Sequence, residues 1–220
     1  MKFLNHDKVL CLSPHPDDVE YAMLGSIMKF KDTQFDVIVL SNGGDFDETS
    51  SDNRCRECEN VWEKIDNLNG SFIGEKFIKS KDEDEWVNLI ESKYDISSYD
   101  TICIPPECDS HFEHSTVNRI GNALTRRQKC GIINYKTPST LDDWKPNFFV
   151  NLDTLENREG NILFSAFIWY IKLNKLNKFV SQSDKSYFKE PSIVSFHSDY
   201  QCSIRGLNKV ESFKICRSYN

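Results

Sequence analysis

Short, largely apolar runs recur along the first two-thirds of this 220-residue chain, and segments with helical periodicity separate them. The run Val9–Leu12 is short, apolar and continuous, as expected for a strand that is buried on both faces. Strands that alternate with helices form a mostly parallel sheet with right-handed crossovers and helices on both faces. We therefore predict an α/β protein, a Rossmann-like three-layer sandwich with a mostly parallel sheet.

The pattern predicts strands at residues 9–12, 35–40, 71–73, 99–104 and 131–135 and helices at 18–29, 54–68, 83–90 and 114–127. The remainder shows no repeat and no regular alternation. A chain of this length, with 39% hydrophobic residues, can bury its core as one domain. We predict a single domain over residues 1–220, in which 1–135 form the core with its functional site. Residues 136–220 should complete the sheet and one wall of the pocket.

Two clusters of potential metal ligands each follow a predicted strand. The first is Ser13-Pro14-His15-Pro16-Asp17-Asp18, and the second is His111-Phe112-Glu113-His114. In a parallel α/β sheet, the site lies beyond the carboxyl ends of the strands, where both clusters should fall. A catalytic zinc ion takes three protein ligands and keeps a position open for water. His15, Asp18 and His114 would form such a set.

Two side chains in these clusters remain for proton transfer. Asp17 would face the metal-activated water as a general base, and His111 could stabilise an oxyanion or protonate a leaving amine. Each group also has a purely structural explanation, because an aspartate after Pro16 can cap a helix and histidines at a helix start can be surface residues. The residues alone leave both explanations open.

Taken together and in this order, the motifs resemble the LmbE-like (PIG-L) family of zinc-dependent N-acetylglucosaminyl deacetylases. Pro14–Asp18 and His111–His114 are the specific part of the resemblance. Weaker similarities follow in the family's order at residues 41–44, 54–57, 146–151, 181–182, 205–206 and 210–213. The chain departs from the family at Phe112, where proline is common, and at Glu113, where aspartate is usual.

The resemblance implies one Zn²⁺ per chain, held by His15, Asp18 and His114. It implies Asp17 as the general base and His111 as the charged partner of the tetrahedral intermediate. The implied reaction removes an acetyl group from the nitrogen of an N-acetylated amino sugar, such as a sugar conjugate or nucleotide sugar.

Further roles follow for the loop after the second strand and for the next helix. We expect Asn42, Gly43, Asp45 and Arg54 to contact the substrate, and Glu113 to support His111. Two other functions stay open: a metal-dependent phosphoesterase, and a carbohydrate-binding relative that has lost activity. A two-metal phosphoesterase would need more carboxylates near the second cluster than Asp109 and Glu113 provide.

The remaining expectations concern partners and compartment. A net charge of -7 argues against binding to nucleic acid, which requires clustered positive charge. The longest apolar run, 162–171, is about half of the ~20 residues that a membrane span needs, so we expect no transmembrane segment. We see no export signal, and scattered cysteines that lie inside apolar runs, such as Cys11 and Cys103, fit a reducing cytoplasm. Cys55 and Cys58 have the spacing of a redox or zinc motif, but no second such pair follows, so we interpret this spacing as coincidence. A homo-oligomer stays open.

Overall fold

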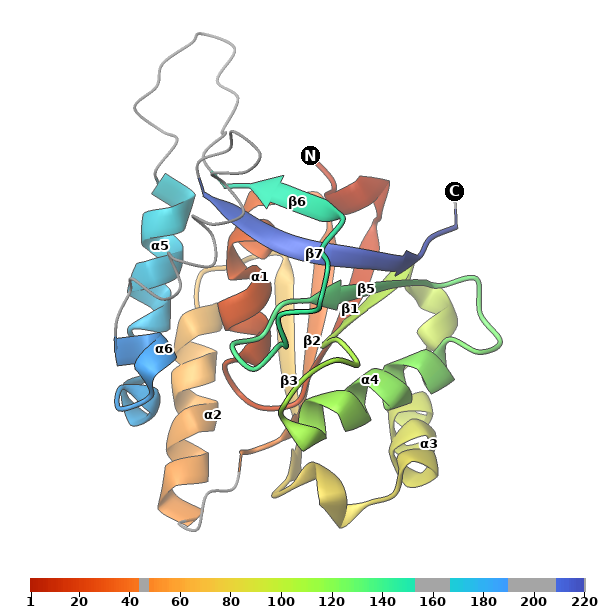
Figure 1. Ribbon diagram of the computed structural model, residues 1–220, viewed down its shortest axis with the longest axis horizontal. Helices are drawn as coiled ribbons and strands as arrows, with labels where there is room; N and C mark the ends of the chain where they lie inside the picture. The colour runs from red at the N-terminus through yellow and green to blue at the C-terminus, as the bar shows by residue number, and fades with distance from the viewer. Residues whose placement is uncertain (44–47, 153–166, 190–208, 220) are drawn as a thin grey trace, which may run out of the picture.

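The protein is described from a computed structural model, which defines residues 1–43, 48–152, 167–189 and 209–219. Within these ranges, seven strands form one sheet in the order β3-β2-β1-β4-β5-β7-β6 (Figure 1). The strands are β1 (Lys8–Ser13), β2 (Gln34–Ser41), β3 (Leu68–Glu75), β4 (Thr101–Ile104), β5 (Gly131–Tyr135), β6 (Phe148–Asn151) and β7 (Val210–Arg217). Strands β1 to β5 are parallel, and β7 runs antiparallel to β5 and β6. The predicted α/β class with a mostly parallel sheet is confirmed.

Helices cover both faces of this sheet (Figure 1). One face carries α1 (Asp18–Lys29), α2 (Glu48–Trp62), α5 (Phe167–Leu176) and α6 (Ser186–Lys189), and the other carries α3 (Glu83–Lys93) and α4 (Phe112–Leu124). Short 3₁₀ turns lie at Phe3–Asn5 (η1), Ile78–Ser80 (η2), Ile96–Ser98 (η3) and Val180–Gln182 (η5). No helix in the described ranges has the length and apolar character needed to cross a bilayer.

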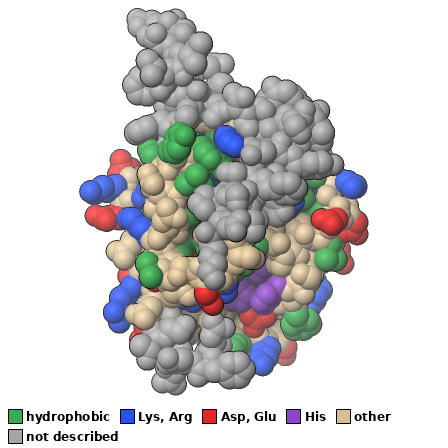
Figure 2. Space-filling model, turned by 60° about the vertical axis from the view of Figure 1, so that its left-hand side comes forward, with side chains coloured by type: hydrophobic (Ala, Val, Ile, Leu, Met, Phe, Trp, Pro, Cys, Tyr) green, Lys and Arg blue, Asp and Glu red, His purple; other side chains and the backbone are tan. Residues whose placement is uncertain are grey.

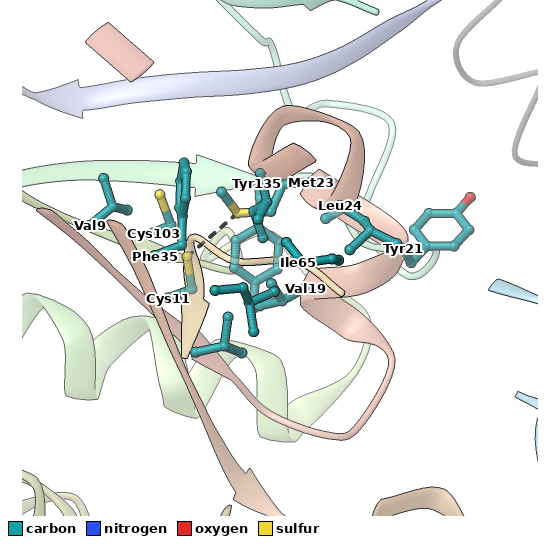
Figure 3. Close-up of a cluster of buried hydrophobic side chains, with 14 of the residues drawn as sticks. Val9, Cys11, Val19, Tyr21, Met23, Leu24, Phe35, Ile65, Cys103 and Tyr135 are labelled. Carbon is teal, nitrogen blue, oxygen red and sulfur yellow. Dashed lines mark hydrogen bonds between the residues drawn. The ribbon is translucent and has the colours of Figure 1, made fainter. Parts of the chain in front are cut away.

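The central strands are buried on both faces, as their apolar sequences require. In β1, Val9 and Cys11 point into the core beneath α1, whereas Leu10 and Leu12 point into the core beneath α3 and α4. All four side chains are fully buried. Figure 3 shows part of the first core, where Cys11 lies beside Met23 of α1. The rigid floor that results holds the ends of β1 and β4 in place.

The predicted helix at 54–68 is misplaced, because α2 begins and ends six residues earlier. Lys64 adopts a left-handed backbone with φ of 63°, a conformation usually supplied by glycine after a helix. Gly70, two residues beyond the predicted helix, lies within β3. A Cβ atom there would come within 2.0 Å of the Trp62 ring, so this glycine makes room for the last residue of α2.

The part of the chain beyond residue 135 joins the same sheet through β6 and β7. A buried ion pair ties β7 to the helical layer: Lys172 of α5 contacts Glu211 of β7 at 2.5 Å. Glu211 also accepts hydrogen bonds from the backbone N–H groups of Gly25 and Ser26 in α1. Of the apolar run 162–171, the residues from Phe167 onward lie in α5, and the earlier ones lie outside the described ranges.

Candidate metal centre

The two ligand clusters meet because β1 and β4 are neighbours in the sheet. From β1 the chain passes to α1 on one face, and from β4 it passes to α4 on the other face (Figure 1). Such a point, where successive connections leave in opposite directions, opens a crevice at the carboxyl ends of the strands. The sequence prediction that both clusters lie at this edge agrees with the structure.

The loop after β1 turns sharply into α1. Asp17 stands immediately before the helix with φ of 123°, a conformation that costs of the order of 1–3 kcal/mol for a residue with a side chain. Its backbone N–H donates to the carboxylate of Glu20 at 3.1 Å, which caps the helix start. Asp17 and Glu20 together form a capping box, so the capping explanation is correct for this turn.

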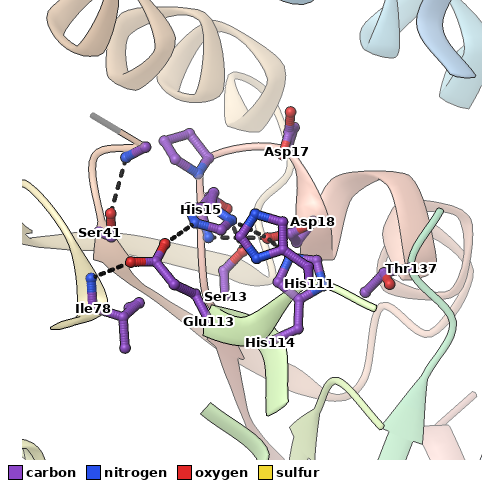
Figure 4. Close-up of polar contacts among 12 residues, drawn as sticks. Ser13, His15, Asp17, Asp18, Ser41, Ile78, His111, Glu113, His114 and Thr137 are labelled. Carbon is purple, nitrogen blue, oxygen red and sulfur yellow. Dashed lines mark hydrogen bonds and ion pairs between the residues drawn. The ribbon is translucent and has the colours of Figure 1, made fainter. Parts of the chain in front are cut away.

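His15, Asp18 and His114 converge on one point (Figure 4). The Oδ2 atom of Asp18 lies 3.2 Å from Nδ1 of His15 and 3.3 Å from Nε2 of His114. Ligands about 2.0–2.1 Å from a tetrahedral zinc ion are about 3.3 Å apart, so the two separations match the edge of that tetrahedron. All three residues are buried.

Each of these histidines uses its second ring nitrogen to contact another carboxylate. Nε2 of His15 lies 2.6 Å from Oε2 of Glu113, and Nδ1 of His114 lies 3.1 Å from Oδ2 of Asp109. Such outer carboxylates fix the orientation and tautomer of metal-binding histidines. Glu113 was expected to support His111, but its hydrogen bonds join it to His15 and to the backbone N–H of Ile78.

The sequence did not identify Asp109 as a supporting residue. Its carboxylate is held by the hydroxyl of Thr137, 28 positions further along the chain, at 2.5 Å. It also accepts the backbone N–H of His111 at 2.8 Å, which sets the start of α4. The sequence shows a carboxylate five positions before His114, but this spacing does not reveal that the carboxylate contacts the His114 ring.

The electrostatics of the cluster favour a bound cation. Burial raises the pKa of Asp18, but His114 and His15 outweigh this effect and hold that pKa well below its usual value. Burial likewise lowers the pKa of His114, and the carboxylates of Asp18 and Asp109 reverse this and raise it to about 10. The buried carboxylates of Asp18 and Asp109 are thus stabilised by positive charge on the histidines. A divalent ion would supply that positive charge in place of the histidine protons.

His111 also lies at the cluster but has a different orientation. One ring nitrogen each from His15, His111 and His114 can be chosen so that all three atoms lie within 4.8 Å of one another. The ring of His111 stacks on that of His114, with centroids 4.5 Å apart and planes inclined by 21°. Burial, together with His15 and His114, lowers the pKa of His111, so these surroundings do not favour the expected imidazolium.

The carboxylate of Asp17 is held by Arg54, and both residues line the same cavity as the metal-ligand cluster. Nη2 of Arg54 donates to Oδ2 of Asp17 at 3.2 Å and to the carbonyl oxygen of Pro16 at 3.1 Å. Burial raises the pKa of Asp17, and the guanidinium opposes that effect. Nη1 of Arg54 donates to the carbonyl oxygen of Gly43, whose φ is 67° and where a Cβ atom would come within 1.9 Å of Nη1.

These side chains line a cavity of about 430 Å³ that opens to the surface. Figure 2 shows histidine side chains reaching one face of the molecule, with acidic side chains beside them. Lys185 and Tyr187 form part of the wall, so residues beyond 135 do contribute to it. The full lining comprises His15, Asp17, Asp18, Gly43, Arg54, Phe77, Lys79, His111, Phe112, Glu113, His114, Pro138, Ser139, Lys185 and Tyr187.

Of the four residues expected to contact substrate, two line the cavity. Gly43 and Arg54 line the cavity, although Arg54 is also bonded to Asp17. Asn42 is not part of the lining, and its side-chain oxygen accepts a hydrogen bond from the thiol of Cys55. Asp45 lies outside the described residues.

Comparisons with known proteins place this architecture among solved folds. The N,N'-diacetylchitobiose deacetylase of Pyrococcus horikoshii superposes with a TM-score of 0.76 at 18% identity, over 98% of this chain and 85% of that one. A zinc-inhibited form of the teicoplanin deacetylase Orf2 gives 0.68 at 9% identity, over 97% and 99%. The 4-carboxy-2-hydroxymuconate hydratase of Pseudomonas putida also gives 0.68, at 12% identity, over 100% and 98%. No protein-family model and no curated sequence matches the chain.

The similarity to these structures extends over nearly the whole chain and establishes the fold. At this level of identity it does not transfer an activity, since the same architecture serves deacetylases and a hydratase. The function must therefore be argued from the side chains of the cavity.

Proposed function

We propose that this chain is a metal-dependent N-deacetylase that removes the acetyl group from the nitrogen of an N-acetylated amino sugar, and that it belongs to the LmbE-like (PIG-L) family. The observation that carries the proposal is the convergence of His15, Asp18 and His114, each histidine backed by a carboxylate, beside the buried carboxylate of Asp17. The shared fold of two deacetylases supports the same conclusion.

We assign one zinc ion to His15, Asp18 and His114 rather than to three histidines. A metal ion lies in the plane of the imidazole that binds it, and the nearly parallel rings of His111 and His114 do not direct lone pairs at one point. Two nitrogens and one carboxylate oxygen form a set that zinc accepts at catalytic centres, with a position left for water. His111 is then free to act on the substrate.

When bound, zinc would polarise the amide carbonyl and lower the pKa of a water molecule. Asp17, which lines the cavity, accepts the proton that the attacking water loses, and Arg54 fixes the position of its carboxylate. His111, whose ring is exposed at the cavity, donates a hydrogen bond to the developing oxyanion, and the proton taken up by Asp17 passes to the departing amine. The strained backbone of Asp17 fits a residue held in position for chemistry.

Both alternative functions receive less support. A second metal ion, as in many phosphoesterases, would need Asp109 and Glu113 as ligands, but the two carboxylates are engaged with His114 and His15. An inactive carbohydrate-binding protein would not require a general base, whereas here the buried carboxylate of Asp17 is held by the buried guanidinium of Arg54 beside the metal ligands.

The direct test is to incubate the zinc-loaded protein with a panel of N-acetylated sugars and sugar conjugates and to measure acetate. Release of one acetate per free amine formed would support the proposal. Zinc-loaded protein that binds these sugars but releases no acetate would contradict it, and water addition to an unsaturated acid instead would favour a hydratase.

A further inference from the structure

A second hollow adjoins the metal cavity. It has a volume of about 520 Å³ and lies between the turn η2 and the helices α3 and α4. Phe112 and Lys79 line both hollows, so the two spaces meet at these side chains. A molecule bound at the metal ligands can therefore continue over Phe112 into the second hollow.

Phe112 is unusually exposed for an aromatic residue. It is the first residue of α4 and has 69% of its surface exposed, more than any other large hydrophobic side chain in the described ranges. Neither core needs this ring, since it packs in neither. An exposed aromatic ring at the rim of a polar cavity offers a flat apolar surface, such as the C–H face of a sugar requires.

The boundary between the hollows is rigidly built. The backbone N–H of Ile78 in η2 donates to Glu113 at 2.8 Å, and its carbonyl oxygen accepts the indole N–H of Trp86 at 2.8 Å. These bonds fix the turn that carries Phe77 and Lys79 against the start of α4, which carries Phe112. The ammonium of Lys79 lies 4.9 Å from the centre of the Phe77 ring, which further orders this side.

The charges of the second hollow balance. Its lining contains three basic and three acidic side chains: Lys79, Lys81, Arg119, Asp82, Glu83 and Asp84. Arg119 pairs with Glu83 at 2.6 Å, and Lys81 pairs with Glu75 at 2.7 Å. A surface with many hydrogen-bonding groups and little net charge suits a neutral polyhydroxylated ligand better than an anion.

From these observations we propose that the substrate is a conjugate in which a second, neutral sugar unit stacks on Phe112 and occupies the adjoining hollow. The inference rests on the proposed deacetylase function and adds the class of the group attached to the N-acetylated sugar. Phe112 then acts as a specificity residue, which explains an aromatic side chain between the two histidines of the second cluster.

The experiment compares N-acetylglucosamine with its β-linked disaccharide and trisaccharide. We expect a higher kcat/KM for the disaccharide, and we expect Phe112→Ala to reduce the disaccharide-to-monosaccharide ratio by about fivefold, the usual scale for loss of one aromatic contact. Phe112→Trp should keep the ratio. Tyr170→Ala, which removes an exposed aromatic ring on α5, is the matched control and should also keep it.

An unchanged ratio in Phe112→Ala, with zinc content equal to that of the unaltered chain, would overturn the inference. So would a preference for a 6-phosphorylated N-acetyl sugar over the neutral disaccharide. If no sugar releases acetate, the proposed function fails, and saturation-transfer NMR then tests the subsite alone. Transfer from the protein to the second sugar ring should be lost in Phe112→Ala, and transfer that persists would exclude this role.

Discussion

Replacement of Glu113 by glutamine should weaken zinc binding without disturbing the fold. In the structure, Oε2 of Glu113 lies 2.6 Å from Nε2 of His15, and its other oxygen accepts the backbone N–H of Ile78 at 2.8 Å. The carboxylate therefore keeps a proton on Nε2, which leaves Nδ1 of His15 free for a metal ion. A glutamine has one oxygen and one NH₂ group, so it cannot accept from both donors.

The magnitude follows from this loss. If the glutamine oxygen keeps the bond to Ile78, its NH₂ group faces Nε2 of His15 and favours the tautomer with the proton on Nδ1, where zinc should bind. The pair is well shielded, with side-chain exposures of 10% for His15 and 14% for Glu113, so little solvent screening softens the change. Loss of such an outer contact costs about 10–100-fold in metal affinity, or about 1.4–2.8 kcal/mol.

The assay is a competition titration of zinc against a chromophoric chelator, with circular dichroism to confirm the fold. Glu91→Gln makes the same charge change near the C-terminal end of α3, in an exposed ion pair with Arg126, and should leave the affinity unaltered. If Glu113→Gln binds zinc as tightly as the unaltered chain, the assignment of His15 Nδ1 as a ligand held by Glu113 is refuted.

Three further changes test other parts of the structure. Asp17→Asn should lower kcat by about 10²–10⁴-fold while one zinc per chain remains, and acetate release close to normal would end its assignment as base. Glu211→Ala leaves the ammonium of Lys172 buried without its partner, so the free energy of unfolding measured in urea should fall by about 3–5 kcal/mol. Adding Lys172→Met should restore part of that free energy, and an unchanged free energy in Glu211→Ala would contradict the account. Gly43→Ala should displace the Arg54 guanidinium and reduce kcat, measured by steady-state kinetics, by about tenfold or more. An unaltered kcat would refute this role of Gly43.

The sequence was most informative where the physics is local. The strands of the parallel core were predicted because continuous apolar runs have few alternatives to a buried strand, and β5 agrees with the prediction at both ends. The meeting of His15 and His114 could also be anticipated, because residues that follow adjacent parallel strands share one edge of the sheet. Family resemblance then suggested which atoms carry the chemistry.

The sequence was least informative where a contact joins distant segments. Helix α2 ends just before Lys64, which adopts a left-handed backbone conformation, and no residue pattern predicts that conformation for a lysine. Asp109 gains its role through Thr137, and Glu113 turns to His15 rather than to its neighbour His111, because side-chain direction on the first turn of α4 decides the partner. Such pairings depend on tertiary geometry that spacing along the chain does not encode.

The central claim concerns which atoms hold the metal ion, and anomalous diffraction at the zinc edge from zinc-soaked crystals tests it most directly. The account predicts one strong peak per chain, bonded to Nδ1 of His15, a carboxylate oxygen of Asp18 and Nε2 of His114. A peak bonded to His111 in place of Asp18, two peaks in the cavity, or no peak between these side chains would contradict it.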